Sequence, residues 1–258
     1  MKKSILFELC AESLQSAITA EAGGANRLEL CGQLSISGIT PDVALMADTI
    51  RAVSIPVHVL IRPRGGDFVY TDEEFAVIQQ QTLQAKAAGA AGVAIGLLLS
   101  NGRIDVKRTR EIAELASPLN VTFHRAFDET TLQSSALEDV IQTGANCLLT
   151  SGGQPNVLQG ADQIASLHRQ ADGRITVMAG GGLSLVNMLE VARRTGVSYL
   201  HGSLIRKRSS SSPSSFPVDH VAADFSPFGE VLLEDVKEAI RLLNDGSPKK
   251  HLKPQFAH

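Results

Sequence analysis

One unit repeats along most of this sequence: a short apolar strand, a glycine or polar turn, and an amphipathic helix. Strands that alternate with helices predict a parallel sheet. Eight such units without a long interrupting domain favour a single (β/α)8 barrel over an open doubly wound sheet, and 258 residues suit one such barrel. The expected strands cover residues 5–9, 27–31, 57–61, 91–95, 120–123, 147–150, 175–179 and 198–201.

Local signals place helices between these strands. Thr71 with Glu74 three positions later forms a capping-box pattern, and Pro41 marks a helix start, where its missing N–H costs little. Gly-Ala or Gly-Val pairs just before strands suit helix C-caps. The expected helices cover residues 13–22, 41–53, 106–116, 132–143, 184–195 and 231–243, with another starting at Thr71. We expect a barrel domain over residues 1–246, a serine-rich loop at 205–230 and a flexible tail at 247–258.

Composition restricts the class of function. The net charge is -3, Trp is absent and there are two Tyr, so neither nucleic acid nor an anionic membrane is an expected partner. The first apolar stretch is interrupted by Glu8 and is too short for a signal peptide or membrane helix. This pattern and the three cysteines, an odd number, favour the cytoplasm, where thiols stay reduced.

Polar side chains gather at the carboxyl ends of the expected strands. Both of the first two strands end in Glu-Leu-Cys, and residues two apart on a strand share a face, so the Glu and Cys side chains point into the barrel. Enzymes of this fold have their active sites at that end. The residues expected there as catalytic candidates are Glu8, Glu29, Arg62, His124 and Asp128. A purely structural ion-pair network is the alternative.

A glycine run follows the seventh expected strand. Gly180, Gly181 and Gly182 precede a helix expected to begin near Ser184, and barrels often bind phosphate between the loops after strands seven and eight. The same glycines could simply form a tight turn. The expected anion-binding set is Arg64, Arg125, Ser151, Gly180, Gly181, Gly182 and Ser203.

The thiols of Cys10 and Cys31 end neighbouring strands, about 5 Å apart across the sheet. Two thiolates at that separation could bind a soft ion such as Cu(I). The spacing lacks the Cys-x-x-Cys pair typical of zinc sites. Both cysteines could equally be small buried hydrophobic residues. Cys147 begins a strand at the opposite end and is expected in the core.

Several of these segments together resemble the CutC family of copper homeostasis proteins. The segments are FELC from Phe7, RLELC from Arg27, IRPRGGDF from Ile61, VTFHRAFD from Val121, LTSG from Leu149 and VMAGGG from Val177. The resemblance covers residues 5–203. It implies a cytoplasmic (β/α)8 barrel that is often oligomeric, with Cu(I) placed on Cys10 and Cys31. The serine-rich stretch at 209–217 departs from the family pattern and suits either a connector or a mobile lid.

Two functions therefore stay open. The first is a cytoplasmic copper homeostasis protein that binds Cu(I) through Cys10 and Cys31. The second is an enzyme acting on a small phosphorylated or carboxylated metabolite. In this second function arginines hold the anion and His124 or Glu29 serves as general acid or base. The charged cluster is richer than a two-thiolate site requires. No organic cofactor is expected in either case.

Overall fold

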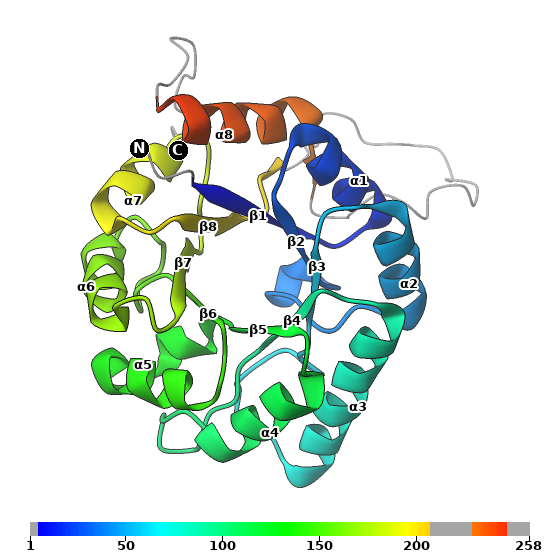
Figure 1. The fold of residues 1–258 in the computed structure, drawn as a ribbon, viewed down its shortest axis with the longest axis vertical. Coiled ribbons are helices and arrows are strands. Elements are labelled where there is room, and N and C mark those ends of the chain that lie inside the picture. Colours follow the sequence, from blue (N-terminus) through cyan, green and yellow to red (C-terminus); the bar gives the residue numbers. More distant parts are fainter. Residues whose placement is uncertain (1–4, 207–228, 247–258) are drawn as a thin grey trace, which may run out of the picture.

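Eight parallel strands form a closed barrel in which each strand pairs with the next and β8 pairs with β1. The computed structural model describes residues 5–206 and 229–246. Figure 1 looks into the ring of strands, with the helices arranged around it. The barrel strands are β1 (Leu6–Ala11), β2 (Arg27–Leu30), β3 (Val57–Leu60), β4 (Gly92–Ile95), β5 (Asn120–Phe123), β6 (Cys147–Thr150), β7 (Thr176–Gly180) and β8 (Tyr199–Gly202). The predicted (β/α)8 barrel is confirmed.

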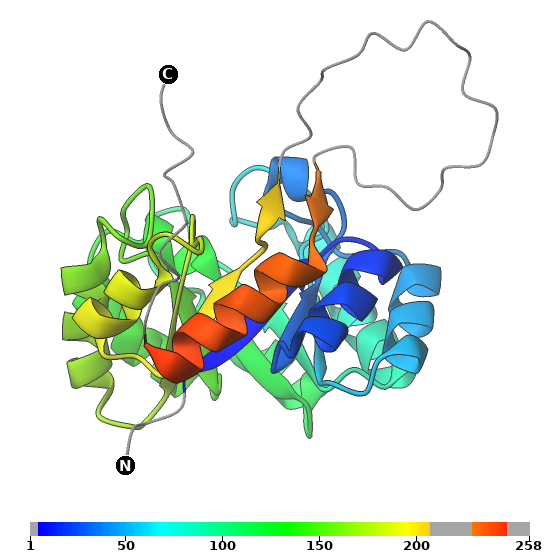
Figure 2. The same ribbon diagram turned by 90° about the horizontal axis from the view of Figure 1, so that it is seen from above.

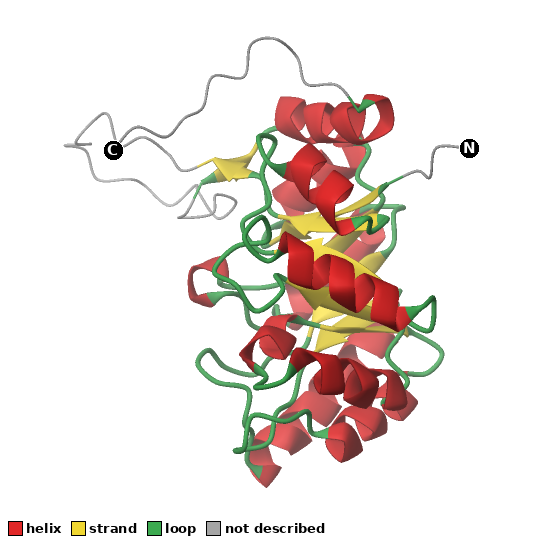
Figure 3. Cartoon of the chain, turned by 90° about the vertical axis from the view of Figure 1, so that its left-hand side faces the viewer, coloured by secondary structure: helices red, strands yellow, loops and turns green. Residues whose placement is uncertain are grey.

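Helices enclose the barrel on the outside (Figure 3). They are α1 (Leu14–Gly23), α2 (Val43–Ala52), α3 (Asp72–Ala88), α4 (Val106–Ala116), α5 (Gln133–Gln142), α6 (Ala161–Ala171), α7 (Met188–Thr195) and α8 (Leu233–Asp245), with short 3-10 turns η1 (Leu34–Ile36) and η2 (Arg125–Glu129). The capping box of Thr71 and Glu74 is present at the start of α3. Helix α6 is absent from the helices predicted from the sequence.

Three predicted helix starts are wrong, one of them that of α8, which begins at Leu233 because Val231 belongs to strand β10 (Glu230–Val231). Helix α2 begins after Asp42, whose side chain accepts the Leu45 N–H, so Pro41 lies before the N-cap. Helix α7 begins at Met188, four residues later than predicted. The side chain of Asn187 causes this delay, because its Oδ1 accepts the Ser184 N–H and its Nδ2 donates to the Gly182 carbonyl. Those bonds hold residues 184–187 in a turn instead of a helix.

The alternation of side chains along each strand divides the protein interior in two. Leu9, Leu28 and Val59 face outward into the main hydrophobic core between sheet and helices. Inside the barrel lie two small apolar groups, one around Cys10, Cys31, Leu60 and Ala94 and the other around Cys147, Leu149 and Met178. Buried charged and polar side chains fill the space between them, and these side chains belong to the candidate site.

Glycines on the inward face of the sheet make room for two imidazole rings. A Cβ atom at Gly92 would lie 2.4 Å from His58 Cε1, and one at Gly96, just after β4, would lie 2.3 Å from His124 Cε1. No real Cβ contact is this short, so each ring depends on a neighbouring glycine. Because Gly92 and Gly96 have no side chains, both imidazole rings can lie against this part of the sheet.

A small antiparallel pair follows the barrel, which the sequence analysis did not predict. Strands β9 (Ile205–Arg206) and β10 (Glu230–Val231) project beyond the ends of the barrel strands (Figure 2). The Arg206 guanidinium forms a two-pronged ion pair with the buried Asp235 carboxylate at the start of α8. The predicted serine-rich stretch at 209–217 and the predicted tail at 247–258 lie outside the described residues.

Candidate functional site at the carboxyl ends of the strands

A cavity of about 840 Å³ opens at the carboxyl ends of the strands. It brings together residues from β1, β2, β3, β5, β6, β7 and β8 or the loops that follow them. The predicted site residues among its lining are Cys10, Glu29, Arg62, His124, Arg125, Asp128, Gly181, Gly182 and Ser203. The expected convergence of Glu29, Arg62 and His124 is thus present. Glu8, Cys31, Arg64, Ser151 and Gly180 do not line this cavity.

Cys10 and Glu29 line one side of the cavity, and Cys31 lies against Cys10 without lining it. The two sulfur atoms lie 3.6 Å apart, and Cys10 Sγ lies 3.4 Å from Glu29 Oε2. Strand register causes this arrangement, because Cys10 pairs with Glu29 across β1 and β2, and Cys31 follows diagonally. All three side chains are buried. Cys10 also lines a second cavity of about 160 Å³ beside Glu12, Ser13 and strand β10.

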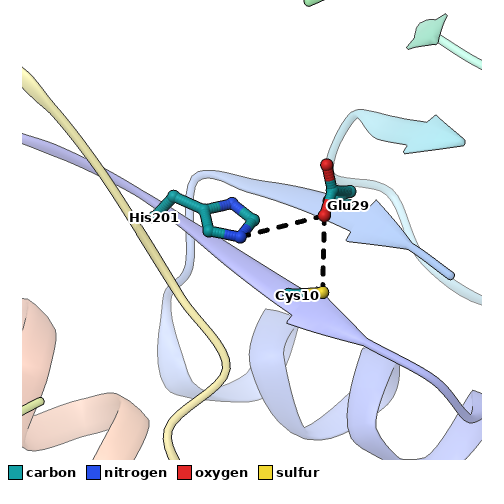
Figure 4. A group of neighbouring side chains, drawn as sticks. All are labelled: Cys10, Glu29 and His201. Atoms are coloured by element: carbon teal, nitrogen blue, oxygen red, sulfur yellow. Dashed lines mark hydrogen bonds and ion pairs between the residues drawn. The ribbon is translucent and has the colours of Figure 1, made fainter. Parts of the chain in front are cut away.

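His201 completes this group and is absent from the predicted site residues. Its Nε2 lies 3.8 Å from Glu29 Oε2, while its Nδ1 hydrogen-bonds Glu8 Oε1 at 2.8 Å. Figure 4 shows the Cys10, Glu29 and His201 side chains converging from three adjacent strands. Possible ligand atoms of these three residues lie within 4.8 Å of one another. The predicted closure of the barrel could have indicated His201 as a site residue, since closure pairs His201 with Glu8.

Glu8 lies below the cavity as a structural ion. It is 1% exposed, and it pairs with Arg27 on one oxygen and with His201 on the other. Burial alone raises a carboxyl pKa, but the hydrogen bond from His201 and the charge of Arg27 outweigh it and hold the pKa of Glu8 at about 2. Both oxygens are occupied, so Glu8 orients His201 instead of facing the cavity.

The pKa values of Cys10, Glu29 and His201 are all shifted from their usual values. The hydrogen bond with Cys31, burial and the charge of Glu29 raise the pKa of Cys10 well above its usual value. Burial, reinforced by Glu8, raises the pKa of Glu29. Burial lowers the pKa of His201, but Glu29, Cys10 and Glu8 outweigh that effect and raise it. The thiol, the carboxyl group and the imidazole lie close enough that each affects the pKa of the others.

Asp128 and Ser151 organise the loops on the opposite side. The Asp128 carboxylate accepts hydrogen bonds from the backbone N–H of Ser151 and Gly153, from two hydroxyl groups and from Arg125. These contacts use both of its oxygens, so Asp128 fixes the loop after β6. Ser151 is fully buried and holds Arg125 Nη2 at 3.1 Å.

Arg64 and Gly180, both expected to bind an anion, have other surroundings. The Arg64 guanidinium is paired with Glu74 and Asp67 outside the cavity lining. Gly180 lies within β7, where a Cβ atom would come within 2.7 Å of Leu149 and 3.0 Å of His201. Gly180 therefore makes room for the His201 side chain.

The comparisons with known proteins agree on one family. The CutC family model matches residues 5–206. The chain belongs to the CutC family. A protein named CutC from Vibrio vulnificus strain YJ016 is 44% identical over 200 residues, which cover 77% of this chain and 80% of that protein. The human copper homeostasis protein cutC homolog is 42% identical over 205 residues, which cover 80% of this chain and 75% of that protein.

A solved structure supports the same assignment. The crystal structure of the CutC protein from Streptococcus agalactiae matches with a TM-score of 0.74 and 30% identity, over 77% of this chain and 98% of that one. The CutC family model ends at Arg206, where β9 ends and the described part of the chain is interrupted. Within the described ranges no helix has the length and apolar character needed to cross a membrane.

Proposed function

We propose that this CutC family protein handles copper in the cytoplasm by binding Cu(I) between the thiolates of Cys10 and Cys31. The observation that carries the proposal is the 3.6 Å separation of the two sulfur atoms. Thiolates are the ligands that a soft ion such as Cu(I) prefers. The name of the human relative supports a role in copper handling, and the three free cysteines suit a reducing compartment. We also expect an oligomer, as the family resemblance implies.

The sulfur separation suits a site with a third ligand. With metal–sulfur bonds of about 2.3 Å, two thiolates lie about 4.0 Å apart in a trigonal site and about 4.6 Å apart in a linear one. The observed 3.6 Å is closer to the trigonal value. His201 Nε2 is a better donor for Cu(I) than Glu29, because imidazole is softer than carboxylate. Its Nδ1 already bonds Glu8, the arrangement of carboxylate behind histidine that orients many metal ligands.

An anaerobic Cu(I) titration against a chromophoric chelator tests the proposal. The wild-type protein should withdraw one Cu(I) per chain from the chelator. A Cys10→Ser/Cys31→Ser variant should lose this binding, whereas Cys147→Ser should keep it, because Cys147 is buried in the other apolar group of the barrel interior. X-ray absorption of the copper-loaded protein should show two sulfur neighbours and one nitrogen, and the nitrogen should disappear in His201→Phe. Undiminished binding by the double variant would refute the thiolate site.

A further inference from the structure

The cavity has a second half, on the side of β3, β5 and β7, that a Cu(I) site does not use. Two of its lining residues, Arg62 and His124, are each 5% exposed. Arg62 Nε and His124 Nε2 are buried and have no hydrogen-bond partner. His124 Nδ1 accepts the Ala126 N–H, so the proton of the neutral ring lies on Nε2. Both unpartnered atoms are therefore hydrogen-bond donors.

The Arg62 guanidinium forms no ion pair with the described residues, although its charge opposes the rise that burial causes in the pKa of Glu129, which lines the same cavity. Its other nitrogens donate to the carbonyl oxygens of Ile36, Gly38 and Gly66, at 2.7 to 3.0 Å. No acidic side chain of the described residues lies within 4.0 Å of it. Arg62 Nε is therefore available as a charged donor to an oxygen atom of a bound molecule. Burial and the charge of Arg62 lower the pKa of His124 to about 3, so the ring itself adds no charge.

The wall at the ends of β7 and β8 is also rich in donors. Gly181, Gly182 and Leu183 line the cavity, and their backbone N–H groups donate to no acceptor in the described ranges. Gly181 and Gly182 have φ values of 105° and 71°, which are backbone conformations that favour glycine. Consecutive N–H groups in such a turn form a concave site for an anion.

Arg125 reaches across to this wall. A Cβ atom at Gly181 would lie 3.0 Å from Arg125 Cζ, so the guanidinium packs directly over the glycine. Asp128 holds Arg125 Nε at 2.9 Å and Ser151 holds Nη2 at 3.1 Å. Nη1 has no partner in the described part of the chain. The fixed guanidinium thus offers a charged donor beside the three N–H groups.

We propose that this half of the cavity binds a small phosphate monoester. Its phosphate group accepts from the Gly181–Leu183 backbone, Arg125 and the Ser203 hydroxyl, and its organic part extends toward His124 and Arg62. Three phosphate oxygens can use this number of donors, whereas a carboxylate has only two oxygens. A cavity of about 840 Å³ is large enough for a small metabolite. The site is independent of Cu(I) binding and gives a structural basis to the small-metabolite alternative.

Calorimetric titration and ³¹P NMR with glycerol phosphate test this site, with inorganic phosphate, glycerate and glycerol as parallel probes. We expect wild-type protein to bind glycerol phosphate at millimolar concentration and glycerate and glycerol much more weakly. Arg125→Gln should weaken binding about tenfold or more. Arg174→Gln is the matched control, because Arg174 has similar exposure, 45% against 43%, and also one ion-pair partner, Glu138.

Three further outcomes separate the alternatives. The Cys10→Ser/Cys31→Ser variant should keep full affinity for glycerol phosphate, so loss of the copper function would leave this inference intact. His124→Phe should weaken glycerol phosphate but not inorganic phosphate, if the organic part extends as proposed. Equal binding by wild type and Arg125→Gln, or a preference for glycerate over glycerol phosphate, would overturn the proposal.

Discussion

At the scale of single residues, the barrel interior can hold the charge of Glu8 because each of its carboxylate oxygens has a specific partner. Glu8 would be very unfavourable at 1% exposure without Arg27 and His201 on its two oxygens. His58, by contrast, is buried in its neutral form. Burial and the nearby charge of Arg27 lower its pKa to about 4, so it is neutral in the folded protein at neutral pH.

The low pKa of His58 predicts a loss of stability in acid. The unfolded chain takes up a proton at this residue below about pH 6.5, whereas the folded protein does so only near pH 4. The contribution of His58 to the free energy of unfolding is therefore fully present above pH 6.5. It is lost as the pH falls toward 4, by about 3 kcal/mol at most. Urea unfolding of wild type and His58→Gln across this interval measures it. The stability of the variant should fall less steeply with decreasing pH, and parallel curves would contradict the assignment.

At the scale of elements, the inward-facing residues in and just after β4 are small, which leaves space for large side chains on the neighbouring strands. Gly92 and Gly96 provide the space for His58 and His124, and Ala94 lies between them on the same face. The outward residues Val93 and Ile95 keep β4 in the main hydrophobic core. The strand thus contributes stability on one face and space on the other.

A Gly96→Ala substitution should show how strongly β4 constrains His124. The new methyl group would overlap the imidazole, and overpacking of this kind typically costs about 1–3 kcal/mol. Combining it with His124→Ala should relieve part of the cost, although Ala126 Cβ at 2.7 Å would still obstruct the methyl group. Chemical denaturation of the two single variants and the double variant gives the coupling energy. Strictly additive effects would show that the ring and the glycine are independent.

At the scale of the whole molecule, the two ends of the described chain are joined. Strand β8 pairs with β1, and α8 packs against α1, which closes both the inner ring of strands and the outer ring of helices (Figure 1). Gly23 in α1 allows this contact, because a Cβ atom there would lie 2.4 Å from Val236 of α8. The last helix is therefore part of the barrel fold.

Two substitutions on α8 test whether this closure supports the barrel. Val236 is fully buried and Leu233, one turn earlier, is 37% exposed. Val236→Asp places a charge in the α1–α8 contact and should cost about 4 kcal/mol or more. Leu233→Asp should change the free energy of unfolding only slightly. Far-UV circular dichroism during urea unfolding distinguishes them. Similar costs for both variants would mean that α8 is peripheral.

The sequence by itself determined the barrel, because its alternating strands and helices and the two-residue periodicity within strands depend only on local chemistry. It also indicated that Glu29, Arg62 and His124 would meet, since the carboxyl ends of parallel strands face one cavity. It could not separate Glu8 from Glu29, which have the same local sequence but lie at different depths.

Only the tertiary structure decided which partner each polar group has. Arg64 is paired with Glu74 outside the cavity, Asp128 is used by the loop after β6, and His201 joins the thiols because β8 closes on β1. The delayed start of α7 likewise depends on the side-chain bonds of Asn187. Those bonds reach only three and five residues back. The contacts of Asp128 and His201 join residues far apart in sequence, and their geometry follows from how the strands and loops pack in three dimensions. Local patterns carry no information about that packing.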